Sequence, residues 1–132
     1  IVLPDGMRYR VLVMPDDRRI TRETLARIAE LVRAGMWLVG APVEHSHGLV
    51  AYPDSDAEVK RLAADLWGDL DGKGRTSRAC GRGRVFWGVS LDRVLAEAGL
   101  GPDVELSSGN NDAVLHWIHR RTADALRPVT LR

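Results

Sequence analysis

The hydrophobic pattern is clearest over residues 8–40, where it predicts a strand, a helix and a second strand in succession. The first strand ends in the apolar run Val11–Met14, which is typical of a buried parallel strand. Apolar residues then recur at the spacing of one helix face: Leu25, Ile28, Ala29 and Val32. Thr21 suits the N-cap of this helix and Gly35 its C-terminal end, and the apolar run Met36–Val39 follows at once. Such a unit is the kernel of an open parallel α/β sheet, with a right-handed crossover.

Two further helices and a strand are predicted by the same reasoning. Ser55 and Glu58 match a capping box, with Ser55 as the N-cap. Apolar residues then line one helix face, with Trp67 expected as an anchor in the core or at its rim: Val59, Leu62, Ala63, Leu66 and Trp67. The apolar run Val85–Trp87 predicts a short strand, and Ser90 is expected to cap a third helix.

The two ends of the chain carry weaker patterns. Pro4–Gly6 is typical of a tight turn, so Ile1–Leu3 is predicted to be the end of a strand that folds back against Arg8–Met14. A domain rarely starts within a hairpin, and we therefore expect a piece of a longer chain. Near the other end, Ala113–His119 predicts a strand, in which His116 and His119 would point to opposite faces.

Together these elements predict an α/β fold: a three-layer, open, mostly parallel sheet of the flavodoxin-like or class I glutamine amidotransferase-like type, incomplete if a first strand is missing. We divide the chain into an α/β domain over residues 1–112 and a final strand with a tail over residues 113–132, because the last residues have no clear hydrophobic period. With 132 residues, the chain is one domain or part of one.

Charge and cysteine content exclude several classes of protein. Lys and Arg number 19 and Asp and Glu 18, so no net charge draws the chain to nucleic acid or to an anionic membrane. No apolar run approaches the roughly 20 residues of a membrane helix. The single Cys80 excludes an internal disulfide and a cysteine-rich zinc site. The start of the chain lacks the pattern of a signal peptide, and the sequence leaves the compartment open.

The stretch Asp69–Arg84 is rich in glycine and carries five basic residues. A phosphate-binding loop is disfavoured, because a predicted helix precedes the stretch and a predicted strand follows it, and because Lys73 is not followed by Ser or Thr. A solvated loop is expected, with an anion or nucleic-acid contact as the alternative. Cys80 resembles a nucleophile only superficially, because no strand is predicted to enter it and no helix to leave it. An exposed free thiol is the favoured interpretation.

The candidate ligand-binding residues are Asp16, His45 and His47. They lie in the loops that follow the first two predicted strands, and in open α/β sheets ligands bind at the carboxyl edge. Two histidines one residue apart, with no further fixed ligand, are a weak indication of a metal site. A solvated loop is therefore the competing interpretation, and no catalytic residue, metal or cofactor is predicted from these residues.

Several blocks of the chain carry a resemblance: Leu3–Asp16, Val32–Gly35, Tyr52–Gly68, Gly83–Gly88 and Trp117–Thr122. In this order they look like consecutive blocks of the α-L-rhamnosidases of glycoside hydrolase family 106 and their relatives. Trp117–Thr122, with the sequence Trp-Ile-His-Arg-Arg-Thr, is the most specific block. The chain is also similar to the amidotransferase-like domain that follows the barrel in several β-galactosidases.

The resemblance implies that a catalytic barrel precedes this region and that β-sandwich material follows it. The acid and base carboxylates and the calcium site of the family belong to that barrel, so no catalytic residue, metal or cofactor is implied here. The expected partners are the barrel of the parent chain and a second copy in a homo-oligomer, without nucleic acid or membrane. After Thr122 the family continues into an aromatic strand, whereas this chain has Leu126–Val129, which indicates a truncation or an altered reading frame.

Three functional hypotheses follow from the sequence. The favoured one is a non-catalytic accessory domain of a glycoside hydrolase, with a structural or oligomer-contact role. The first alternative is a free-standing α/β module that binds a ligand through Asp16, His45 and His47. The second is a small hydrolase that uses Cys80.

Overall fold

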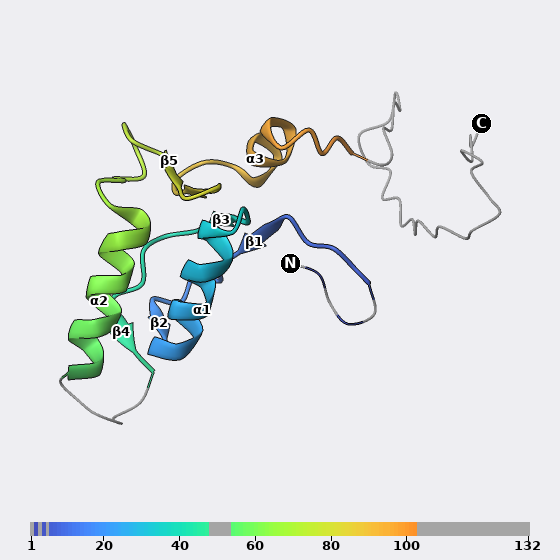
Figure 1. Cartoon of the computed structure of the whole chain (residues 1–132). Helices are drawn as coiled ribbons and strands as arrows, with labels where there is room; N and C mark the ends of the chain where they lie inside the picture. The colour runs from blue at the N-terminus through green and yellow to red at the C-terminus, as the bar shows by residue number, and fades with distance from the viewer. Residues whose placement is uncertain (1, 3, 5, 48–53, 103–132) are drawn as a thin grey trace, which may run out of the picture.

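The predicted strand–helix–strand unit lies at the centre of the molecule (Figure 1). The computed structural model describes residues 2, 4, 6–47 and 54–102. Strands β1 (Val11–Val13) and β3 (Trp37–Val39) pair in parallel, and helix α1 (Arg22–Arg33) connects them. Thr21 is the N-cap of α1, as predicted, and its hydroxyl oxygen accepts a hydrogen bond of 3.3 Å from the amide of Thr24.

Among the described residues, two more strands extend this pair to a four-stranded sheet of order β1-β3-β6-β5. Strand β6 (Gly83–Phe86) pairs in parallel with β3, and β5 (Ser77–Cys80) pairs antiparallel with β6. Two very short strands, β2 (Arg19–Ile20) and β4 (His45–Ser46), form a separate parallel sheet that the hydrophobic pattern did not predict. The α/β class and the mostly parallel sheet are thus confirmed.

Side chains of a strand alternate between the two faces of the sheet, and a cluster of apolar residues packs on each face. Helices α1 and α2 (Asp54–Trp67) pack on the face that carries Leu38, where the larger cluster includes the following buried residues: Leu25, Val32, Leu38, Val59, Leu66, Trp67 and Val85. On the other face, Val94 of the short helix α3 (Leu91–Glu97) packs with Val39 and Phe86. This gives the predicted three layers. The finer assignment to a flavodoxin-like or amidotransferase-like sheet stays a prediction.

Helix α2 has the predicted apolar face but a different start. The helix begins at Asp54, so Ser55 lies inside its first turn and the predicted capping box is wrong. Ser55 is buried, and its hydroxyl has no hydrogen-bond partner in the described part of the chain. Trp67 is a core anchor, as expected, with 2% of its surface exposed and an indole N–H that donates a 2.8 Å hydrogen bond to the carbonyl of Gly40.

The prediction of a solvated loop over residues 69–84 is wrong, because its second half is the β5–β6 hairpin. The turn of this hairpin packs on the C-terminal end of α1, where the amide of Arg82 donates to the carbonyl of Arg33 over 3.0 Å. A Cβ atom on Gly83 would lie 2.2 Å from the carbonyl oxygens of Val32 and Met36, and only glycine allows this approach. Gly83 therefore allows the hairpin to pack on the end of α1 and does not serve to bind a phosphate.

The first half of that stretch is an ordered loop against Trp87. The carboxylate of Asp71 accepts hydrogen bonds from the amides of Lys73 (2.8 Å) and Arg75 (2.9 Å), which closes the loop on itself. Gly72 lies on the indole, so closely that an added Cβ would be 2.8 Å from Cε2 of Trp87. The loop is thus held by one carboxylate and one ring.

Cys80 is placed differently from the prediction. Strand β5 does run into Cys80, but the chain turns directly into β6. A nucleophile elbow needs a helix after the strand, so the hairpin excludes that role on geometric grounds. The thiol is half-buried against the larger core cluster and is not the exposed thiol that we expected.

The N-terminal prediction is confirmed at one position, because Val2 pairs with Arg8 in an antiparallel bridge. The predicted strand Ala113–His119 and the boundary after residue 112 lie outside the described residues. Among the helices that are described, none has the length and apolar composition needed to cross a membrane.

Candidate functional site

The predicted ligand-binding edge is occupied by the small β2–β4 sheet, which continues from the carboxyl ends of β1 and β3. His45 lies in β4 opposite Arg19, and the amide of His47 donates to the carbonyl of Ile20 over 3.2 Å. Asp16 is exposed in the turn that follows β1. No contact joins Asp16 to either histidine among the described residues, so the three predicted residues do not form one cluster there.

Asp56, in the first turn of α2, holds β4 in place. Its Oδ1 accepts a 2.7 Å hydrogen bond from the amide of Ser46, and its Oδ2 lies 3.3 Å from Nδ1 of His45. The amide of Ser46 is the main cause that lowers the pKa of the Asp56 carboxyl, followed by the hydrogen bond with His45. His45 thus has a structural partner that the sequence pattern did not indicate.

Two further carboxylates beside the small sheet, Asp17 and Glu44, are also paired. The carboxylate of Asp17 accepts from the amide (3.0 Å) and from Nε (3.3 Å) of Arg19, and these bonds lower its pKa, with a smaller effect of His47. Arg18 forms an ion pair with Glu44. Asp17 is thus held by Arg19, and among the described residues neither Asp16 nor Asp17 forms a hydrogen bond or ion pair with His47. In the part of the chain that the structure describes, no three His, Cys, Asp or Glu side chains are grouped to hold a metal.

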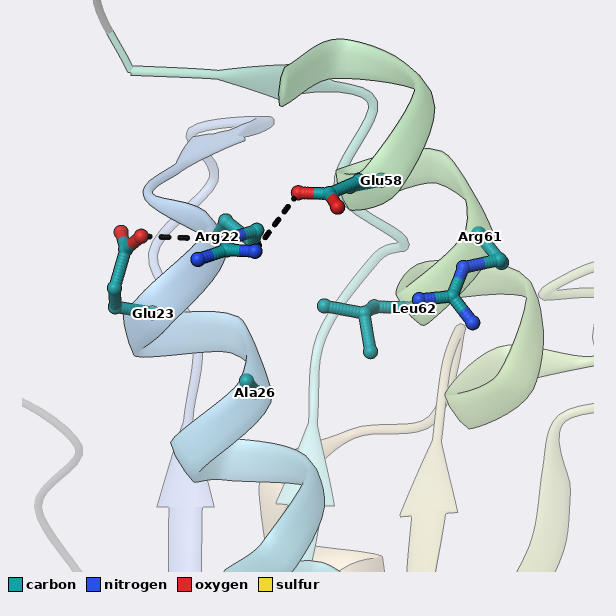
Figure 2. A pocket seen from close by; sticks show the side chains of 6 residues that line it. All are labelled: Arg22, Glu23, Ala26, Glu58, Arg61 and Leu62. Carbon is teal, nitrogen blue, oxygen red and sulfur yellow. Dashed lines mark hydrogen bonds and ion pairs between the residues drawn. The ribbon is translucent and has the colours of Figure 1, made fainter. Parts of the chain in front are cut away.

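A hollow lies between helices α1 and α2 (Figure 2). It has a volume of about 330 Å³ and is lined by six residues: Arg22, Glu23, Ala26, Glu58, Arg61 and Leu62. Figure 2 shows the guanidinium of Arg22 between the two carboxylates, with Nη1 at 3.1 Å from Glu58 and Nε at 3.3 Å from Glu23. The sequence pattern does not reveal this groove, because its charged residues come from two helices that are far apart in the chain.

The charged residues of the groove are paired with one another and are not arranged for acid–base catalysis. Both carboxylates are bound to the same guanidinium, and the hydrogen bond that Arg22 donates to Glu23, together with the charge of Glu58, raises the pKa of Arg22. The carboxylate of Glu23 accepts hydrogen bonds from its own backbone amide and from Arg22. Both bonds lower the pKa of Glu23, so this carboxylate is held in its ionised form. A proton donor at neutral pH would need the opposite shift.

The exposed apolar side chains gather at another place. Among the described residues, four of the five large hydrophobic side chains that are exposed precede or belong to β1, and we call these four the β1 strip: Val2 (65%), Met7 (51%), Tyr9 (47%) and Val13 (51%). Strand β1 is at one edge of the sheet, and Figure 1 shows the N-terminal segment leading into it. An apolar strip at a sheet edge is typical of an interaction surface.

Comparison with known proteins gives concordant matches. Residues 1–126 match the sequence model of the family Glyco_hydro_106, described as alpha-L-rhamnosidase. A curated protein of Formosa agariphila named "Putative beta-glucuronidase" is 33% identical over 125 residues, which are 95% of this chain and 10% of that protein. The solved structure of a rhamnosidase from Novosphingobium sp. PP1Y shares the fold with a TM-score of 0.63 at 24% identity, over 80% of this chain and 10% of that one. The chain therefore spans about a tenth of the length of these relatives.

Proposed function

Because the chain belongs to the alpha-L-rhamnosidase family of glycoside hydrolases, we propose that it acts as a non-catalytic accessory region of a larger glycosidase. The observation that carries this proposal is one of length. The match extends over nearly the whole chain, yet the chain spans only about a tenth of the relatives. By this proposal the parent enzyme hydrolyses terminal rhamnosides, and this region supports the catalytic barrel or forms an oligomer contact.

The chemistry of the described side chains supports an accessory role. Glycoside hydrolysis normally uses two carboxyl groups on either side of the sugar, one of which must donate a proton. In the groove, Glu23 and Glu58 are both bound to Arg22. At the carboxyl edge, Asp17 and Asp56 are engaged by backbone amides that lower their pKa values. Glu23, Asp17 and Asp56 are thus held as anions, and Glu58 is engaged in its ion pair with Arg22.

The size of the natural product tests the proposal. An antibody raised against the chain is used to blot a lysate of the source organism. We expect a band several times heavier than 14.6 kDa, with α-L-rhamnosidase activity that co-purifies with it. The isolated chain is expected to release no nitrophenol from 4-nitrophenyl α-L-rhamnoside. A single band at 14.6 kDa would exclude an accessory region of a larger enzyme.

A free-standing binding module is the second candidate, and one observation favours it. The small sheet places His45 and His47 at the edge where ligands of open α/β sheets bind. Calorimetric titration of the chain with Zn²⁺ and, separately, with L-rhamnose tests this candidate. Heat of binding that is lost in the double variant His45→Ala/His47→Ala would support it, and no heat with either ligand would exclude both ligand classes.

A further inference from the structure

The outer side of β1 has backbone groups with no strand to pair with in the described part of the chain. The carbonyl of Arg10 accepts from the amide of Trp37 over 2.9 Å, and the amide of Met14 donates to the carbonyl of Val39 over 2.8 Å. Both bonds point toward β3. Because backbone groups alternate along a strand, the amides and carbonyls of Val11 and Val13 point the other way, away from the sheet.

The two edges of the sheet differ in their side chains. At the β5 edge, Ser77 and Arg78 are polar or charged, as is usual where an edge must not pair with another chain. At the β1 edge, Val13 is 51% exposed, and the other exposed residues of the β1 strip precede it in the chain. Unpaired backbone groups beside apolar side chains fit an added β-strand better than they fit water.

The register of the N-terminal segment indicates which strand this is. Val2 lies opposite Arg8 in an antiparallel bridge, so each step back along the first segment corresponds to one step forward along the second. Continued in the same register, the residues of the parent enzyme that precede Ile1 would lie opposite Arg10 and β1. Resting on the proposed function, we propose that the outer edge of β1 binds the segment that directly precedes Ile1 in the parent enzyme, as an antiparallel fifth strand of this sheet.

This strand has a defined chemistry. It supplies an amide and a carbonyl to each of Val11 and Val13, and it presents apolar side chains next to Val13. It also forms one continuous hairpin with β1 through the turn that Gly6 enters with a φ of +87°. The contact joins this region to the rest of the enzyme through the backbone, so its register is fixed by the chain itself.

Residue-resolved hydrogen exchange tests the proposal in three proteins: the 132-residue chain, the same chain lengthened by the parent residues that precede Ile1, and the whole parent enzyme. In the 132-residue chain the amides of Val11 and Val13 are expected to exchange fast. In the other two proteins they are expected to slow by about tenfold, near the upper end of what one net backbone hydrogen bond contributes. The amide of Met14, bonded to β3, is the internal control and is expected to be protected in all three.

Each outcome decides the question. Slow exchange of Val11 and Val13 in both longer proteins supports the proposal. Slow exchange in the parent alone would overturn it, because another strand would then occupy the edge. Protection in the 132-residue chain that grows with its concentration would also overturn it, in favour of a second copy. Fast exchange in all three overturns it but leaves the accessory role intact, since that role depends on the parent-sized band alone.

Discussion

Replacing Trp67 by phenylalanine tests how the larger core cluster is closed. Trp67 is the last residue of α2, is 2% exposed, and donates a 2.8 Å hydrogen bond from its indole to the carbonyl of Gly40, directly after β3. Phenylalanine keeps an aromatic ring but removes the donor and part of the bicyclic volume. The variant therefore breaks the one side-chain hydrogen bond that links the end of α2 to the end of β3 in the described structure.

Two losses add in this variant. Leaving the half-buried carbonyl of Gly40 without its donor costs about 1–3 kcal/mol. Removing the pyrrole part of the indole is equivalent to roughly two buried methylene groups, or about 1.6 kcal/mol at about 0.8 kcal/mol each. We expect Trp67→Phe to lower the free energy of unfolding by about 2.6–4.6 kcal/mol, a large share of the roughly 5–15 kcal/mol of a typical domain.

The assay is urea unfolding of the 132-residue chain, followed by far-ultraviolet circular dichroism so that the loss of a tryptophan does not change the signal. Trp37→Phe is the matched control. Trp37 is half-buried and stacks on Phe86 with ring centroids 5.1 Å apart, and its indole makes no hydrogen bond to a described residue. A cost below about 1.5 kcal/mol is expected for the control, as for a tolerated apolar replacement.

A third variant separates the hydrogen bond from the packing. Benzothienylalanine at position 67 keeps the bicyclic shape and lacks the N–H, so it is expected to lose about 1–3 kcal/mol, the hydrogen-bond share alone. Equal costs for Trp67→Phe and Trp37→Phe would refute the reasoning, because the buried bond would then contribute nothing. Absence of a cooperative transition in the unchanged chain would refute it as well, since the core would not form without the rest of the parent enzyme.

Three further predictions concern other parts of the molecule. Gly83→Ala is expected to lower the free energy of unfolding by about 1–3 kcal/mol in the same urea assay, because its Cβ would meet two carbonyl oxygens at 2.2 Å. Gly101→Ala is the control and is expected to change this free energy by no more than about 0.5 kcal/mol, because no described atom lies within 4 Å of the added Cβ. Amide hydrogen bonds lower the folded-state pKa of Asp71, so its contribution to stability is present above the unfolded value near 3.9 and is lost as the pH falls through the folded value; Asp71→Asn should flatten the acid limb of a thermal-melting profile, and an unchanged limb would contradict this. Glu58→Gln is expected to leave the urea midpoint unchanged, because exposed ion pairs contribute little, and a large shift would show that the Arg22 groove is more rigid than its exposure indicates.

The parts of the fold that the sequence predicted are those with strong local signals. The apolar face of α1, its N-cap Thr21 and the flanking apolar runs are all consecutive in the chain, and they define the parallel pair β1–β3. The face of α2 and the core position of Trp67 were equally clear, because five apolar residues repeat at helical spacing. In α2 only the start was misplaced, because the helix begins at Asp54 and Ser55 lies inside its first turn.

The hairpin β5–β6 was not predicted, because its glycines are required by contacts with atoms that are far away in the sequence. Gly83 is required by the carbonyls of Val32 and Met36, which belong to the end of α1 and the residue before β3. A stretch rich in glycine and arginine indicates a loop when its own sequence is considered alone. Nothing in the stretch itself shows that a helix end lies against it. The partner of His45 was not predicted for a similar reason. His45 is paired with Asp56, eleven positions further along the chain and in the next helix.

The carboxyl edge of the sheet is where an open α/β fold normally binds its ligand, and in this chain that edge is filled by the chain itself. The β2–β4 sheet sits on it, Asp56 and Asp17 are held by backbone amides, and Arg18 is paired with Glu44. A ligand there would first have to displace these bonds. At β1, in contrast, apolar side chains are exposed beside backbone groups that point away from the sheet. The surface that can still bind a partner is therefore the β1 edge and not the carboxyl edge of the sheet. An accessory region that is joined to a larger enzyme would require such a surface.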